Sequence, residues 1–83
     1  MRVRLRQSTR VLGPSFSTVR RALESGVFST AELDPGAPGS PGLWTVEAGE
    51  LARWLAGRAT PDAELSGILA DAYESELVRR FKV

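Results

Sequence analysis

The chain of 83 residues contains no cysteine and no histidine. Without cysteine there is no disulfide and no thiolate zinc site, and without histidine the commonest general base and metal ligand is missing. The sequence also shows no glycine-rich phosphate loop and no close carboxylate pair of a kind expected in a catalytic pocket. We therefore expect no enzymatic activity, no cofactor and no metal site.

Long apolar runs are absent as well. No stretch approaches the length that spans a bilayer, and the opening Met1-Arg-Val-Arg is not followed by the apolar region of a signal peptide. At 42% hydrophobic and 25% charged residues, the composition is typical of a folded soluble protein. We expect one small domain with a small core, inside the cell and without a membrane partner.

The formal net charge of only +1 hides an uneven distribution of charge. Residues 1–23 carry six arginines and no acid, residues 24–52 carry five acids and no base, and the remainder carries five of each. A positive patch confined to one segment is typical of phosphate contact. A GC-rich genome would explain the preference for arginine over lysine, but not the clustering. The arginines of the first segment are Arg2, Arg4, Arg6, Arg10, Arg20 and Arg21.

The most informative pattern is a helix-turn-helix signal early in the chain. Gly13 can adopt the positive φ that stops a helix, and Pro14 cannot continue one because it lacks an N–H donor. Ser15 is a good N-cap for a second helix from about Phe16 to Ser25, and Gly26 would end that helix. A second helix set across the first by a short turn has the right size for a DNA major groove.

This second helix has one apolar and one polar side. Val19, Ala22 and Leu23 recur at helical spacing and predict a buried stripe. The residues that project from the other side are Ser17, Arg20, Arg21 and Glu24. An ordinary αα-hairpin, in which such arginines only form a solvated face, is the alternative interpretation.

The flanking segments predict a first helix and a wing. Val3–Leu12 reads as a short lead-in followed by the first helix, and Val27 and Phe28 read as a short strand. Asp34–Gly42 is rich in Pro-Gly steps and predicts a loop tip, after which Leu43–Val46 predicts a strand. Together these predict a β-hairpin. A linker between two domains is the alternative, but 33 residues before it are too few for a stable core.

Two more helices follow. Glu47–Ala56 is amphipathic, with Leu51, Trp54 and Leu55 on one side, and Gly57 is expected to end it. Thr60 as N-cap and Pro61 at the first helical position predict a last helix that runs to about Arg80. The apolar stripe of this last helix comprises Leu65, Leu69, Tyr73, Leu77 and Phe81. The stripe predicts either self-association or packing back on the third helix.

The order and spacing of these motifs resemble a known family over about residues 3 to 58. The run from Leu12 to Gly26, the strand Leu43-Trp44-Thr45-Val46 and the helix Leu51-Ala52-Arg53-Trp54-Leu55 resemble the excisionase / MerR-like winged helix-turn-helix DNA-binding family. The resemblance implies a winged helix-turn-helix domain in residues 1–58, and the C-terminal helix predicted in residues 59–83 lies outside it. Together they predict a mainly α fold with a small β-hairpin. The implied core residues are Val19, Leu23, Trp44, Leu51, Trp54 and Leu55.

The resemblance also implies a function. We expect double-stranded DNA as partner, with the helix Phe16–Ser25 in the major groove, in a recombination directionality (excisionase-like) factor or a transcriptional regulator. Such a protein would be cytoplasmic, bacterial or phage-encoded, and nucleoid-associated, and its last helix could bind a second copy or a recombinase. The residues expected at the DNA are Arg4, Arg6, Arg10, Ser15, Phe16, Ser17, Thr18, Arg20 and Arg21.

The wing departs from the family pattern. Between Ser29 and Gly42 it carries Glu32 and Asp34 and no base, so phosphate would repel it unless these acids face away. The acidic wing and the apolar last helix favour a second hypothesis, a winged-helix protein-interaction or assembly/packaging factor with little DNA affinity.

Overall fold

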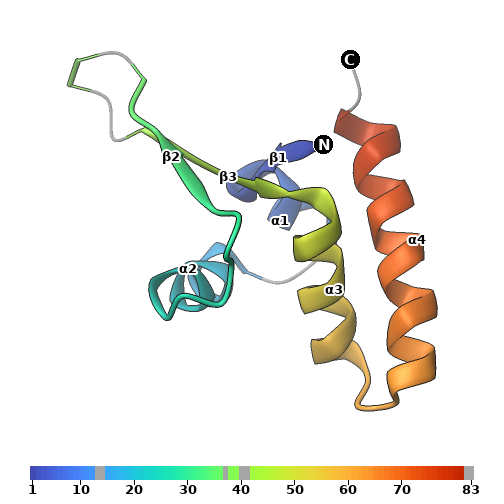
Figure 1. Ribbon diagram of the computed structural model, residues 1–83. Helices are drawn as coiled ribbons and strands as arrows, with labels where there is room; N and C mark the ends of the chain where they lie inside the picture. The colour runs from blue at the N-terminus through green and yellow to red at the C-terminus, as the bar shows by residue number, and fades with distance from the viewer. Residues whose placement is uncertain (13–14, 37, 40–41, 82–83) are drawn as a thin grey trace.

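The computed structural model describes residues 1–12, 15–36, 38–39 and 42–81, with the backbone alone for residues 9–12 and 16. The described chain is mainly helical and carries a small antiparallel sheet (Figure 1). The turn predicted at Gly13 and Pro14 lies outside the described residues. The elements in chain order are β1 (Arg2–Arg4), α1 (Leu5–Leu12), α2 (Phe16–Glu24), β2 (Glu32–Asp34), β3 (Leu43–Glu47), α3 (Ala48–Ala59) and α4 (Ala63–Phe81).

The sheet has three strands in the order β1-β3-β2, with β3 antiparallel to both neighbours. The β2–β3 pair is the predicted hairpin, whereas β1 occupies the segment that the sequence indicated only as a lead-in to the first helix. Val3 lies opposite Val46, and Leu33 lies opposite Trp44. Because side chains alternate along a strand, these four residues share one face of the sheet.

That shared face is buried only over part of its length. Val3 and Val46 belong to the core, but Trp44 is 38% exposed and Leu33 is exposed beside it. The prediction that Trp44 lies in the core is therefore wrong. The helices cover the end of the sheet formed with β1, and the β2–β3 hairpin, which carries Leu33 and Trp44, extends beyond them (Figure 1).

The segment after α2 is a helix stop and not a strand. The N–H of Gly26 donates to the carbonyl of Leu23 at 3.2 Å, and the N–H of Val27 donates to the carbonyl of Ala22 at 3.2 Å. With Gly26 at φ 80°, this is a Schellman motif, and it confirms Gly26 as the residue that ends the helix. The strand predicted at Val27 and Phe28 is wrong, because Val27 serves this cap and β2 begins only at Glu32.

The predicted boundaries of the last two helices also need correction. α3 continues through Gly57 to Ala59. Gly57 does not have the positive φ that would mark the end of a helix. α4 begins at Ala63, later than the predicted Pro61. The reason is a different cap: the Oδ1 atom of Asp62 accepts hydrogen bonds from the backbone N–H groups of residues 64 and 65, at 2.9 and 3.0 Å.

The core lies between the buried face of the sheet and the helices. α3 and α4 run antiparallel and side by side, and α4 adds Leu77, which is fully buried (Figure 1). Residues from both predicted segments, 1–58 and 59–83, therefore share one core cluster. Its members are Val3, Leu5, Val19, Ala22, Phe28, Val46, Ala48, Leu51, Leu55 and Leu77. Of the predicted core residues besides Trp44, Leu23 and Trp54 are only partly buried and pack against this cluster.

Within the described ranges, no helix combines the length and the apolar character needed to cross a bilayer.

Candidate nucleic-acid interface

Helix α2 is held at its start by the predicted cap. The side-chain oxygen of Ser15 accepts a hydrogen bond from the backbone N–H of Thr18 at 3.3 Å, and the two hydroxyl oxygens lie 3.0 Å apart. Val19 and Ala22 are buried against the core, so the helix cannot rotate without exposing them. This fixes which side of α2 faces outwards. The exposed residues of that side are Ser17, Arg20, Arg21 and Glu24.

The two arginines of α2 differ in their surroundings. The Nε atom of Arg20 donates to Oε1 of Glu24 at 3.2 Å, in an i,i+4 ion pair whose side chains are both about two-thirds exposed. Such a surface pair contributes about 0–1 kcal/mol, so a phosphate can replace the carboxylate at little cost. Arg21 is exposed and forms no ion pair within the described part of the chain.

Two of the predicted arginines outside α2 converge with Arg20. Arg4 at the end of β1 and Arg6 at the start of α1 line a hollow of about 610 Å³ together with Arg20. The hollow lies between the β1–α1 junction, the second half of α2 and the start of β3. Its other described lining residues are Leu5, Gln7, Leu23, Glu24, Gly42, Leu43 and Trp44.

The remaining predicted DNA-contact residues are placed as follows. Ser17 is exposed, Thr18 is half-buried, and Ser15 is exposed but occupied by the cap. The side chains of Arg10 and Phe16 lie outside the described part of the chain. The structure therefore brings Arg4, Arg6 and Arg20 together, and holds Ser17 and Arg21 on the exposed side of α2.

Trp44 and Leu43 line this hollow, and no motif of the sequence predicts that position. The β-branched and aromatic residues of this segment predict its strand, and the family resemblance implies a buried tryptophan. Alternation along a strand assigns side chains to two faces, but it does not say where along the strand the core ends. The one available signal was the long Pro/Gly loop that precedes Leu43, because strands next to such a tip extend away from the core.

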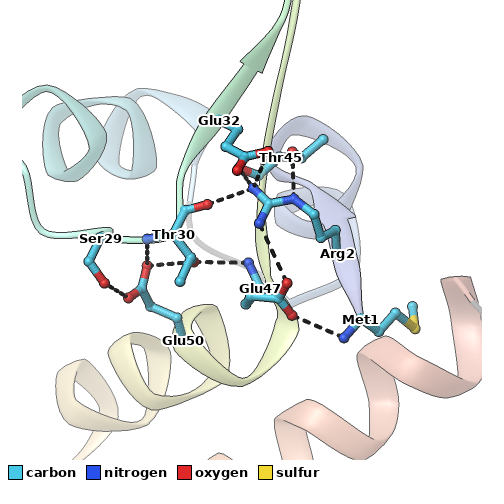
Figure 2. A network of polar contacts seen from close by, with 8 residues as sticks. All are labelled: Met1, Arg2, Ser29, Thr30, Glu32, Thr45, Glu47 and Glu50. Atoms are coloured by element: carbon cyan, nitrogen blue, oxygen red, sulfur yellow. Dashed lines mark hydrogen bonds and ion pairs between the residues drawn. The ribbon is translucent and has the colours of Figure 1, made fainter.

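Arg2 belongs to the basic segment but is engaged elsewhere. Its guanidinium donates to the carbonyl oxygens of Thr30 at 2.6 Å and Thr45 at 3.0 Å, and it pairs with Glu47 at 3.5 Å and Glu32 at 3.8 Å (Figure 2). This network lies on the polar face of the sheet, opposite the face that carries the tryptophan. It turns Glu32 of the β2–β3 hairpin towards a cation of the same chain.

A second carboxylate fixes the segment that leads into β2. Glu50 of α3 accepts hydrogen bonds from the Ser29 hydroxyl at 2.6 Å, the Thr30 N–H at 3.0 Å and the Thr30 hydroxyl at 2.9 Å (Figure 2). Partial burial by itself would raise the pKa of Glu50, but these hydrogen bonds outweigh it, and the pKa lies below its ordinary value of 4.5. The ionised form of Glu50 therefore ties the segment before β2 to α3.

Replacing Glu50 with Gln is expected to lower stability at neutral pH by about 1–2 kcal/mol, because the three donors lose a charged acceptor. The folded-state pKa is depressed, so this contribution is present above pH 4.5 and is lost as the pH falls through the folded-state pKa. Urea unfolding at neutral pH and near pH 3 should show the variant losing less stability on acidification than the original chain. Exposed Glu64 offers the matched control, and an equal effect of Glu64→Gln would contradict this role.

The fold buries part of the apolar stripe predicted for association and leaves its first residue exposed. Leu77 is fully buried, Tyr73 and Phe81 pack against the core, and Leu69 is half-buried. Leu65 is 53% exposed. Most of the stripe is thus used within the chain, and the association role stays a prediction for its first turn.

Comparison with known proteins gives no match, whether with protein-family models, curated proteins or solved structures. The family resemblance therefore rests on the sequence motifs alone. Among the described residues, no group of three or more acidic side chains is arranged to hold a metal ion.

Proposed function

We propose that the protein binds duplex DNA by placing the exposed side of α2 in the major groove, as a transcriptional regulator or an excisionase-like recombination factor. The observation that carries this proposal is Arg21, an exposed arginine without an acidic partner among the described residues, on a helix whose opposite side is locked into the core. Guanidinium groups bind guanine edges and phosphates in bidentate geometry.

The position of α2 supports this proposal. α2 and α4 lie on opposite sides of α3, so a duplex can approach α2 without meeting the last helix (Figure 1). Arg4 and Arg6 stand beside α2 and add positive charge along the path of a phosphate backbone.

The acids of the wing oppose DNA binding less than the sequence suggested. Glu32 is paired with Arg2, and the Oδ1 atom of Asp34 accepts a hydrogen bond from the Gly36 N–H at 3.2 Å. Both acids project from the sheet face opposite Trp44, according to the strand register. Repulsion of phosphate on the tryptophan side of the wing is thereby reduced.

The double replacement Arg20→Ala/Arg21→Ala is expected to weaken duplex binding by about 1–3 kcal/mol for each interaction with a base or phosphate that it removes. Fluorescence anisotropy with a labelled duplex at several salt concentrations measures this effect. The chain offers a matched control in Arg79→Ala/Arg80→Ala, a second pair of adjacent exposed arginines near the end of α4. The control removes the same charge and should leave affinity nearly unchanged.

The single variants sharpen the test. Arg21→Ala should cost more affinity than Arg20→Ala, because Arg20 must first leave Glu24 to contact DNA. Each phosphate interaction that is removed should also reduce the salt slope of log affinity by about 1. Equal weakening by the α2 and α4 double variants would indicate a general charge effect and would refute the assignment to α2.

A protein-interaction or assembly factor is the second candidate. It is favoured by Leu65 and Ile68, which are 53% and 62% exposed on the first half of α4. This function requires that the folded protein show no salt-sensitive duplex binding, and that replacing Leu65 and Ile68 with Ser release a partner protein.

A further inference from the structure

The hollow beside α2 is open where β1 ends. Arg4, the last residue of β1, pairs with Thr45, and β3 extends two residues further towards the loop, where no described strand pairs with it on this side. Leu43 and Trp44 therefore lie along an uncovered stretch of β3, and the second half of α2 forms the other wall. The volume of about 610 Å³ falls in the range of small-ligand sites, about 300–1,000 Å³.

The lining combines two chemistries. Three arginines, Arg4, Arg6 and Arg20, line the hollow, and the single described acid in the lining is Glu24, whose carboxylate is already paired with Arg20. Trp44, which is 38% exposed, belongs to the same lining, together with Leu23 and Leu43. A site with excess positive charge and an available aromatic ring suits a ligand that carries an anion next to a flat apolar group.

We propose that this hollow binds an unpaired nucleotide, with the base against Trp44 and the phosphate between Arg4 and Arg20. The inference rests on the proposed DNA binding through α2 and specifies the substrate further. The DNA would be a duplex with an adjoining single-stranded segment, as at an overhanging end, a gap or a junction.

The geometry favours an unpaired over a paired nucleotide. In a duplex the faces of the bases are stacked on their neighbours and cannot meet a tryptophan, whereas an unpaired base exposes its face. Arg20 links the two sites, because it lies both on the exposed side of α2 and in the lining of the hollow. A strand leaving the major groove at the second half of α2 would enter the hollow directly.

The test compares a blunt duplex with the same duplex carrying a four-thymidine overhang. The overhang should strengthen binding about ten-fold, which corresponds to about 1.4 kcal/mol and lies within the range for stacking of a base on an aromatic side chain. Trp44→Ala should abolish this gain and leave blunt-duplex affinity unchanged. Trp44→Phe, which keeps an aromatic ring, should retain most of it.

Charge in the hollow is tested in the same way. Arg4→Gln should reduce the gain from the overhang, while Arg53→Gln, an exposed arginine of α3, should not. Blunt-duplex binding reports on the proposed function, and the gain from the overhang reports on the hollow, so the two proposals can fail separately. An overhang without effect, or a Trp44→Ala variant that weakens both DNAs equally, would overturn the inference.

A second measurement does not depend on removing Trp44. The chain has two tryptophans, so Trp54→Phe leaves Trp44 as the only indole. Addition of oligothymidine should quench its fluorescence, and an abasic oligonucleotide of the same length should quench it much less. Equal quenching by the two oligonucleotides would refute nucleotide binding. Quenching only by an acidic peptide rich in phenylalanine would also refute it and would assign the hollow to a protein partner.

Discussion

Replacing Leu77 with Ala is expected to lower the free energy of unfolding by about 2–5 kcal/mol. Leu77 has no exposed surface and joins α4 to the core cluster that also contains Leu51 and Val19. Truncation leaves a cavity that the antiparallel α3–α4 pair cannot close without shifting one helix against the other. For a domain whose total stability is about 5–15 kcal/mol, this is a large fraction. Urea-induced unfolding followed by circular dichroism measures it.

Leu65→Ala is the matched control on the same helix. Leu65 is 53% exposed, so its truncation should cost well under 1 kcal/mol. Equal costs at the two positions would contradict the docking of α4 on α3. A urea midpoint that rises with protein concentration in the original chain, but not in Leu65→Ala, would instead reveal the association predicted for this helix.

Local signals in the sequence were sufficient to predict helix α2. Ser15 caps its start and Gly26 ends it, as expected, because capping depends on hydrogen bonds between residues a few positions apart. The same reasoning failed at the start of α4. Thr60-Pro61-Asp62 contains two possible caps in three residues, and the Asp62 carboxylate accepts the first free N–H groups in place of the Thr60 hydroxyl.

Features that depend on distant residues could not be read from the sequence. β1 is only three residues long, and it exists because Val3 meets Val46 across the sheet. Nothing near Val3 in the sequence indicates that pairing. Trp44 was misplaced for a related reason, since the strand pattern gives its face but not the extent of the helices that cover the sheet.

In the candidate site, too, local features could be predicted from the sequence and long-range contacts could not. Clustering of arginines predicted a basic surface, and Arg4, Arg6 and Arg20 do converge. Arg2 is diverted from that surface by carbonyls and carboxylates of β3 and of the segment before β2. Charge counted along the sequence therefore overstates the charge offered to a ligand, because acids far along the chain fold back onto the basic segment.

The second large effect is expected at Phe28. Phe28→Ala should lower the free energy of unfolding by about 3–5 kcal/mol, because its ring is 5% exposed and meets Trp54 edge to face with centroids 5.3 Å apart. It joins the end of α2 to α3, so its loss should loosen the helix proposed to contact DNA as well as the core. Hydrogen exchange would then show less protection in α2 than in α4.

The neighbouring residue provides the control. Val27 is 48% exposed, and its backbone N–H, which completes the cap of α2, is retained in Val27→Ala. That variant should cost less than about 1 kcal/mol. Because only one of the two neighbouring side chains is anchored on Trp54, a similar loss at both positions would mean that the cap, and not the aromatic contact, fixes α2 on the core.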